Sequence, residues 1–111
     1  MKAIRIGVLL GACVVLAIGG SMWLRRDVRS HSVTLSWQAP PPLQGVTVVG
    51  YNVYRSTTSG TQYARVATRV PSRQYEDRLV NSGRTYSYVV TALDQAGRES
   101  RYSGEVKVQV P

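Results

Sequence analysis

From residue 31 onward, apolar and polar residues alternate in short runs, and this period-two pattern is the feature that most constrains the fold. The first run is His31–Gln38, whose apolar members are Val33, Leu35 and Trp37. Because successive side chains of a strand point to opposite faces, such a run predicts a strand with one buried face. Similar segments, separated by clusters of Pro, Gly, Ser and Asn, follow at Val46–Ser56, Tyr63–Val70, Gln74–Arg78, Arg84–Asp94 and Tyr102–Val110.

Six short strands with no amphipathic helix between them predict an all-β domain, built as a sandwich or a barrel. The chain has 111 residues, which is enough for one such domain and an appendage but not for two cores. We therefore predict a single folded domain over residues 31–111.

The N-terminal segment has a different composition. Ile6–Leu24 contains 19 residues without a charge, with Lys2 and Arg5 before it and Arg25 and Arg26 after it. As a helix this run would span about 28 Å, close to the ~30 Å hydrocarbon core of a bilayer. We therefore predict a transmembrane signal anchor over residues 1–24 and a basic linker over residues 25–30.

The alternative is a signal peptide that is cleaved, leaving a secreted domain. Small residues at Ala17 and Gly19 would suit a cleavage site. The length of the uncharged run and its charged flanks favour the uncleaved anchor, and a short segment before it usually means that the following domain is exported. The single cysteine, Cys13, lies within this run, so neither an intramolecular disulfide nor a thiolate metal site is expected.

Four motifs of the domain occur in a recognisable order. The tryptophan that ends the first run precedes a proline turn at 40–42; GYNVYR follows at 50–55, then the run Gly83–Ala92, then SRYS at 100–103. Together they resemble a fibronectin type III domain of the kind found in bacterial extracellular proteins, over about residues 31–111. Together with the predicted anchor, this resemblance leads us to expect a single-pass protein of the bacterial envelope, with its domain outside the cytoplasm.

That resemblance also implies an immunoglobulin-like sandwich of two antiparallel sheets, with strands lettered A to G. Trp37 on strand B and Tyr51 on strand C would form the core, together with Tyr88. Tyr86 would be a tyrosine corner, its hydroxyl bonded to backbone in the preceding loop. Strand A should precede residue 31, where the membrane segment leaves little room, so we expect it to be short or missing.

Catalysis needs titratable side chains that converge on a pocket, and the sequence predicts none. The single histidine, His31, stands at the start of a strand and is interpreted as a surface residue. Glu76 and Asp77 are neighbours on a predicted strand, so they point to opposite faces. Asp94 and Glu99 flank a hairpin, where Asp commonly stabilises the turn. We therefore predict that the protein is not an enzyme and has no cofactor or metal.

With catalysis set aside, we predict an interaction module that either binds a protein partner or serves as a spacer. The sequence does not reveal the identity of that partner. Tyr54, Val89 and Leu93 are expected to point outward from one sheet and form a candidate partner face, unless they only pair across strands. An ancillary carbohydrate-binding role is the alternative, resting on exposed Tyr54, Tyr63 and Tyr102.

Electrostatic adhesion to an anionic surface is a third hypothesis, because the net charge is +8. The arginines are scattered rather than clustered, which argues against specific nucleic-acid binding. The sequence gives no support for a homo-oligomer, although it does not exclude one.

Overall fold

The computed structural model describes residues 6–9 and 31–111; the predicted linker and the rest of the predicted anchor lie outside these ranges. The six strands predicted after residue 30 are all present, although the last begins at Val106 rather than Tyr102. The strands are β1 (Ile6–Leu9), β2 (Val33–Trp37), β3 (Val48–Ser56), β4 (Ala64–Val70), β5 (Gln74–Asp77), β6 (Thr85–Asp94) and β7 (Val106–Gln109).

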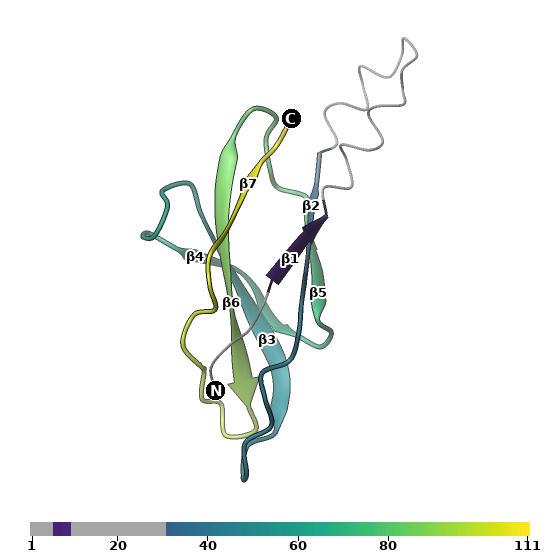
Figure 1. The fold of residues 1–111 in the computed structure, drawn as a ribbon, viewed down its shortest axis with the longest axis vertical. Helices are drawn as coiled ribbons and strands as arrows, with labels where there is room; N and C mark the ends of the chain where they lie inside the picture. The colour runs from purple at the N-terminus through teal and green to yellow at the C-terminus, as the bar shows by residue number, and fades with distance from the viewer. Residues whose placement is uncertain (1–5, 10–30) are drawn as a thin grey trace.

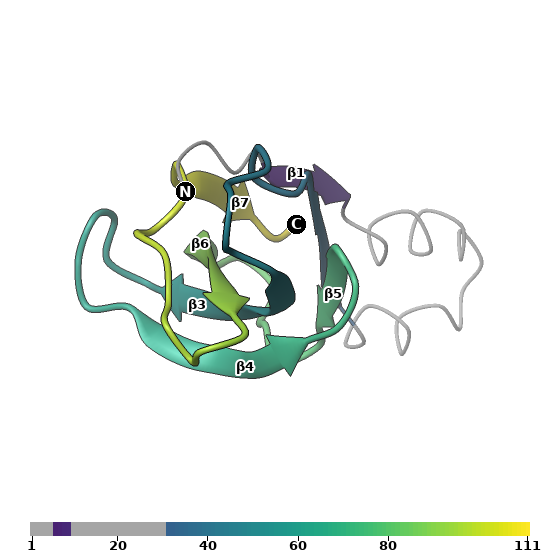
Figure 2. The ribbon, with the colours of Figure 1, turned by 90° about the horizontal axis from the view of Figure 1, so that it is seen from below.

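The strands form two antiparallel sheets (Figure 1), one with the order β1-β2-β5 and the other with the order β4-β3-β6-β7. Seen from below in Figure 2, β5 stands to the right of β3 and β6, so that the two sheets form separate layers. The two-sheet antiparallel sandwich is therefore confirmed.

Strand β1 corrects the expectation for the N-terminal segment. It pairs antiparallel with β2, with Ile6 opposite Trp37 and Leu9 opposite Thr34. The first strand of the family fold is therefore present with four residues, and it takes them from the segment predicted to be a membrane helix. Four residues within a longer uncharged run fit a strand as well as a helix, and periodicity alone does not separate the two.

The remainder of the predicted membrane helix, residues 10–24, lies outside the described residues. Among residues 6–9 and 31–111, no helix is long and apolar enough to cross a membrane.

Both sheets contribute side chains to the core. The four aromatic residues predicted for it, Trp37, Tyr51, Tyr86 and Tyr88, are all buried. The rings of Trp37 and Tyr51 meet edge to face, with centroids 5.4 Å apart, which is a favoured geometry for aromatic pairs. Around them lie Val33, Leu35, Val53, Val80, Val90, Ala92, Val108 and Val110.

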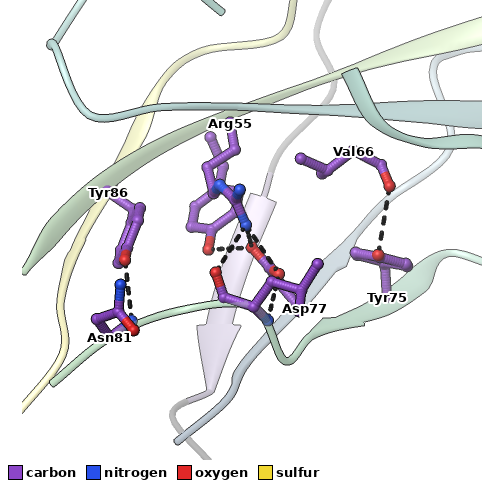
Figure 3. Close-up of polar contacts among 8 residues, drawn as sticks. Arg55, Val66, Tyr75, Asp77, Asn81 and Tyr86 are labelled. Atoms are coloured by element: carbon purple, nitrogen blue, oxygen red, sulfur yellow. Dashed lines mark hydrogen bonds and ion pairs between the residues drawn. The ribbon is translucent and has the colours of Figure 1, made fainter. Parts of the chain in front are cut away.

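The hydroxyl of Tyr86 accepts a hydrogen bond from the backbone N–H of Asn81 at 2.9 Å (Figure 3). Asn81 lies in the loop that leads into β6. This is the tyrosine corner that the resemblance implied, and it ties the loop to the strand that follows it.

A buried carboxylate joins the two sheets. Asp77, at the end of β5, is 1% exposed, and it accepts a hydrogen bond from Arg55 of β3 at 2.9 Å (Figure 3). It also accepts one from the Tyr88 hydroxyl of β6 at 2.7 Å. The backbone N–H of Leu79 also donates to it, at 3.0 Å. We call Asp77, Arg55 and Tyr88 the inter-sheet clamp.

The pKa values of the inter-sheet clamp reflect this packing. Burial and the hydrogen bond to Asp77 raise the pKa of Tyr88 well above its ordinary value. Burial acts to lower the pKa of Arg55, but the hydrogen bond and the charge of Asp77 outweigh it, and that pKa rises. Arg55 and Tyr88 therefore stay protonated, and each remains a hydrogen-bond donor to Asp77.

Asp77 and its neighbour Glu76 offer a matched test of the clamp. Asp77→Ala leaves the Arg55 guanidinium without its partner inside the domain and is expected to cost about 3 kcal/mol of stability. Glu76 pairs with Arg78 at the surface, and Glu76→Ala should leave the urea midpoint nearly unchanged. Equal midpoints for the two variants, measured on the full chain in mild detergent, would contradict this role of Asp77.

Candidate interaction face

Three tyrosines meet on the outer face of the four-stranded sheet, away from the core. Tyr54 comes from β3, Tyr63 from the residue before β4, and Tyr102 from the segment between β6 and β7. The ring centroid of Tyr102 lies 5.1 Å from that of Tyr54 and 5.4 Å from that of Tyr63. Tyr102 is 53% exposed and the other two are half-buried. We call these residues the tyrosine patch.

Tyr102 is positioned by an irregular segment that runs beside β6. The backbone N–H of Ser100 donates to the carbonyl of Ala92 at 2.8 Å, and that of Ser103 donates to the carbonyl of Val90 at 2.9 Å. The two serine hydroxyls in turn accept hydrogen bonds from the backbone N–H groups of Ala92 and Val90. These four bonds fix the backbone on both sides of Tyr102, and they occupy the edge of β6 ahead of its regular pairing with β7, which begins at Val106.

The carboxylate of Glu99 fixes Tyr54. Its Oε2 accepts hydrogen bonds from Asn52 Nδ2 at 3.0 Å, from Thr91 Oγ1 at 2.6 Å and from the Tyr54 hydroxyl. Burial acts to raise the pKa of Glu99, but these three donors outweigh it, and the pKa lies below its ordinary value. Burial and the bond to Glu99 raise the pKa of Tyr54, so its hydroxyl remains a donor.

Asn52 connects this face to the bend in β4. Its Oδ1 accepts a hydrogen bond from the backbone N–H of Arg69 at 2.9 Å. Arg69 has a φ of 54°, in the left-handed region that side chains other than glycine rarely adopt, and it lies where the register of β3 and β4 shifts. A Cβ on Gly50 would come within 3.2 Å of the Arg69 backbone, so the close approach here favours glycine.

Glu105 fixes Tyr63 in the same way. It accepts hydrogen bonds from the Tyr63 hydroxyl, from the backbone N–H of Gly60 at 2.7 Å and from Ser59 Oγ at 3.0 Å. These donors lower the pKa of Glu105 to about 2. Burial and the bond to Glu105 raise the pKa of Tyr63 to about 12. The loop between β3 and β4 is thereby tied to the segment before β7.

The predicted partner face is only partly accessible. Tyr54 and Leu93 are partly exposed, as expected for contact residues. Val89 pairs with Tyr54 across the strands but is only 2% exposed, so it cannot contact a partner, and its inclusion in the face was wrong. Alternation identifies the outward direction of a side chain, but not whether other side chains cover it.

Other sequence-based expectations concern titratable residues. His31 was interpreted as a surface residue, but it is buried. Asp94 accepts hydrogen bonds from the backbone N–H groups of Ala96 and Arg98, at 2.9 Å and 2.8 Å, and thus stabilises the turn. In the part of the chain that the structure describes, no group of three or more His, Cys, Asp or Glu side chains could hold a metal ion.

The surface around the tyrosine patch is suited to binding. A shallow hollow of about 600 Å³ lies beside the patch and is lined by Tyr54, Thr91, Glu99, Ser100, Arg101 and Tyr102. It offers aromatic ring edges, a carboxylate and a guanidinium on one accessible surface. The sequence indicated that these three tyrosines are exposed, but nothing in the order of residues shows that the chain brings them together.

Because the pKa of Glu105 lies at about 2, below its ordinary value of 4.5, its bonds stabilise the fold above pH 4.5 and are lost as the pH falls toward 2. Glu105→Gln should therefore have a lower urea midpoint than the unchanged chain above pH 4.5. Its midpoint should also fall less than that of the unchanged chain as the pH is lowered from 4.5 toward 2. The neighbouring Lys107→Gln is the control, since lysine does not titrate there. Parallel midpoint curves for Glu105→Gln and the unchanged chain would contradict this assignment.

The family model described as "Fibronectin type III domain SaeA third domain" matches residues 23–111. The amylopullulanase of Thermoanaerobacter thermohydrosulfuricus is 41% identical over 75 residues, which are 68% of this chain and 5% of that enzyme. Chitinase A1 of Niallia circulans is 36% identical over 81 residues, 73% of this chain and 10% of that enzyme. The chain thus spans only a small part of these relatives.

Among solved structures, an Fn3-like protein from Clostridium thermocellum is 39% identical with a TM-score of 0.63, over 72% of this chain and 77% of that one. The twitchin kinase region of C. elegans shares the fold, with a TM-score of 0.65 and 20% identity over 74% of this chain and 14% of that one. Domains of this kind therefore occur within enzymes and within a titin homolog of Caenorhabditis elegans, and they are typically non-catalytic modules. This chain belongs to the fibronectin type III family.

Proposed function

We propose that this chain is a non-catalytic interaction module, anchored in a membrane by residues 6–24, with its domain outside the cytoplasm of a bacterial envelope. Its binding surface is the tyrosine patch, and its partner is a protein. One observation carries the proposal: exposed Tyr102 packs between Tyr54 and Tyr63, whose hydroxyls are tied to Glu99 and Glu105.

Tyrosine suits a protein interface because its large, rigid ring has an apolar body and a polar tip. Here the hydroxyls of Tyr54 and Tyr63 are already held by hydrogen bonds, and the ring of Tyr102 packs against both. Binding would therefore order few additional side chains, and the entropic cost of association falls. Arg101, which lines the same hollow, adds a charged group at the margin of the patch. A preorganised aromatic centre with a polar rim is the usual anatomy of a protein-binding site.

Carbohydrate binding is a second candidate, favoured by the relatives named amylopullulanase and chitinase. Sugar rings stack best on flat aromatic surfaces. The ring of Tyr102 is inclined by 56° to that of Tyr54 and by 64° to that of Tyr63, so the patch is not a flat platform. This geometry favours a protein partner over a polysaccharide.

Membrane anchoring rests on the 19 uncharged residues between Arg5 and Arg25. We expect the full chain to stay in the membrane fraction after carbonate washing, with an intact mass that includes residues 1–24. Recovery of a soluble form whose N-terminus lies near Gly20 would show that the segment is a cleaved signal peptide instead.

The tyrosine patch is tested by capturing partners from detergent-solubilised membranes with the full chain. Tyr102→Ala should weaken capture about thirtyfold, the loss expected of a hot-spot residue worth ~2 kcal/mol. Leu43→Ala is the matched control, because Leu43 is 52% exposed and lies elsewhere on the domain. The protein-binding proposal fails if the two variants behave alike, or if Tyr102→Ala instead abolishes retention on starch or chitin. Loss of all binding at moderate salt would favour electrostatic adhesion.

A further inference from the structure

Strand β1 and the proposed membrane anchor use the same residues. Ile6–Leu9 lies in the sheet beside β2, and it also forms the first four positions of the uncharged run Ile6–Leu24. Without these four residues the run keeps 15, which span about 22 Å as a helix and fall short of a ~30 Å bilayer core. Ile6–Leu9 therefore cannot complete both the sheet and the membrane span at the same time.

The hydrogen bonds of β2 show what the withdrawal of β1 would expose. The backbone N–H of Trp37 donates to the carbonyl of Arg73, at 3.0 Å, on the β5 side. In an antiparallel ladder the backbone groups of alternate residues point to alternate sides. Thr34 and Ser36 therefore direct their N–H and C=O groups toward β1, whereas Leu35 directs its own toward β5. We call the groups of Thr34 and Ser36 that face β1 the β2 edge.

We propose that the β2 edge is a strand-acceptor site. Strand β1 fills it when the N-terminal segment is outside the membrane, and an extended, uncharged strand of a partner protein fills it when that segment is inserted. This inference rests on the membrane anchoring proposed above. The β2 edge would be a second binding surface, separate from the tyrosine patch, and it would be accessible only in the anchored chain.

The chemistry of the occupant follows from β1 itself. Its four residues, IGVL, carry no charge, and they pair antiparallel with Gly7 opposite Ser36 and Leu9 opposite Thr34. Exposed edge strands are commonly protected by lysine, proline or an inward-pointing charge. Strand β2, with the sequence VTLSW, has none of these. Without β1 its edge would offer main-chain hydrogen bonds to any uncharged strand of matching length.

Amide hydrogen exchange on the full chain tests this directly. In phospholipid vesicles, the amides of Thr34 and Ser36 should exchange at least about tenfold faster than in a Leu16→Arg variant, whose charge keeps the segment out of the bilayer. The Leu35 amide, which points toward β5, is the internal control and should stay slow in both. Adding a synthetic peptide of residues 3–11 to the vesicles should slow Thr34 and Ser36 again.

A second substitution separates the role of β1 from that of the bilayer. Leu9→Pro in the Leu16→Arg variant removes the N–H opposite Thr34, and it should speed exchange of Thr34 and Ser36 without lipid. Slow exchange of both amides in a chain that sediments with the vesicles would mean that β1 stays docked and that residues 10–24 suffice to hold the chain at the membrane, which overturns this inference. Fast exchange that the peptide does not slow would refute the acceptor site. Failure of the chain to sediment with vesicles would overturn the anchor, and with it this inference.

Discussion

A charge buried between two layers has to be satisfied by groups from both, and the rest of this domain depends on how Asp77 meets that requirement. Its carboxylate comes from the three-stranded sheet, and Arg55 and Tyr88 reach it from the four-stranded sheet. A slip of one sheet past the other would leave the ion pair broken inside the domain, at a cost of several kcal/mol. The apolar core stabilises the packing of the two sheets without fixing their relative position, whereas the inter-sheet clamp favours one alignment of the sheets.

Because the alignment is fixed by inward-facing groups, the opposite faces of the same strands are free to carry function. Along β3, Tyr51 and Val53 enter the core, while Asn52 and Tyr54 face outward to Glu99. A register shift of one residue would exchange the two sets. The core and the tyrosine patch are thus two consequences of a single pattern of alternation.

That alternation explains which features could be predicted from the sequence. The strands follow from local periodicity, whereas the aromatic core and the tyrosine corner were expected from the resemblance to the fibronectin type III family. The bonds of Glu99 and Glu105 join residues up to 47 positions apart, through segments that are not regular strands, and no local pattern marks them. Val89 and His31 were misjudged because their burial depends on what packs over them. Strand β1 was missed because its four residues lie within a longer uncharged run whose length is typical of a membrane helix.

The claim that binding occurs at the tyrosine patch is tested most directly by photo-crosslinking in intact cells. A photoreactive phenylalanine derivative placed at Tyr102, at the centre of the patch, is compared with the same group at Leu79, which is exposed in the loop after β5. We predict a light-dependent adduct of discrete mass with a second protein from position 102 and none from position 79. No adduct at position 102, or equal adducts at both positions, would contradict the proposal.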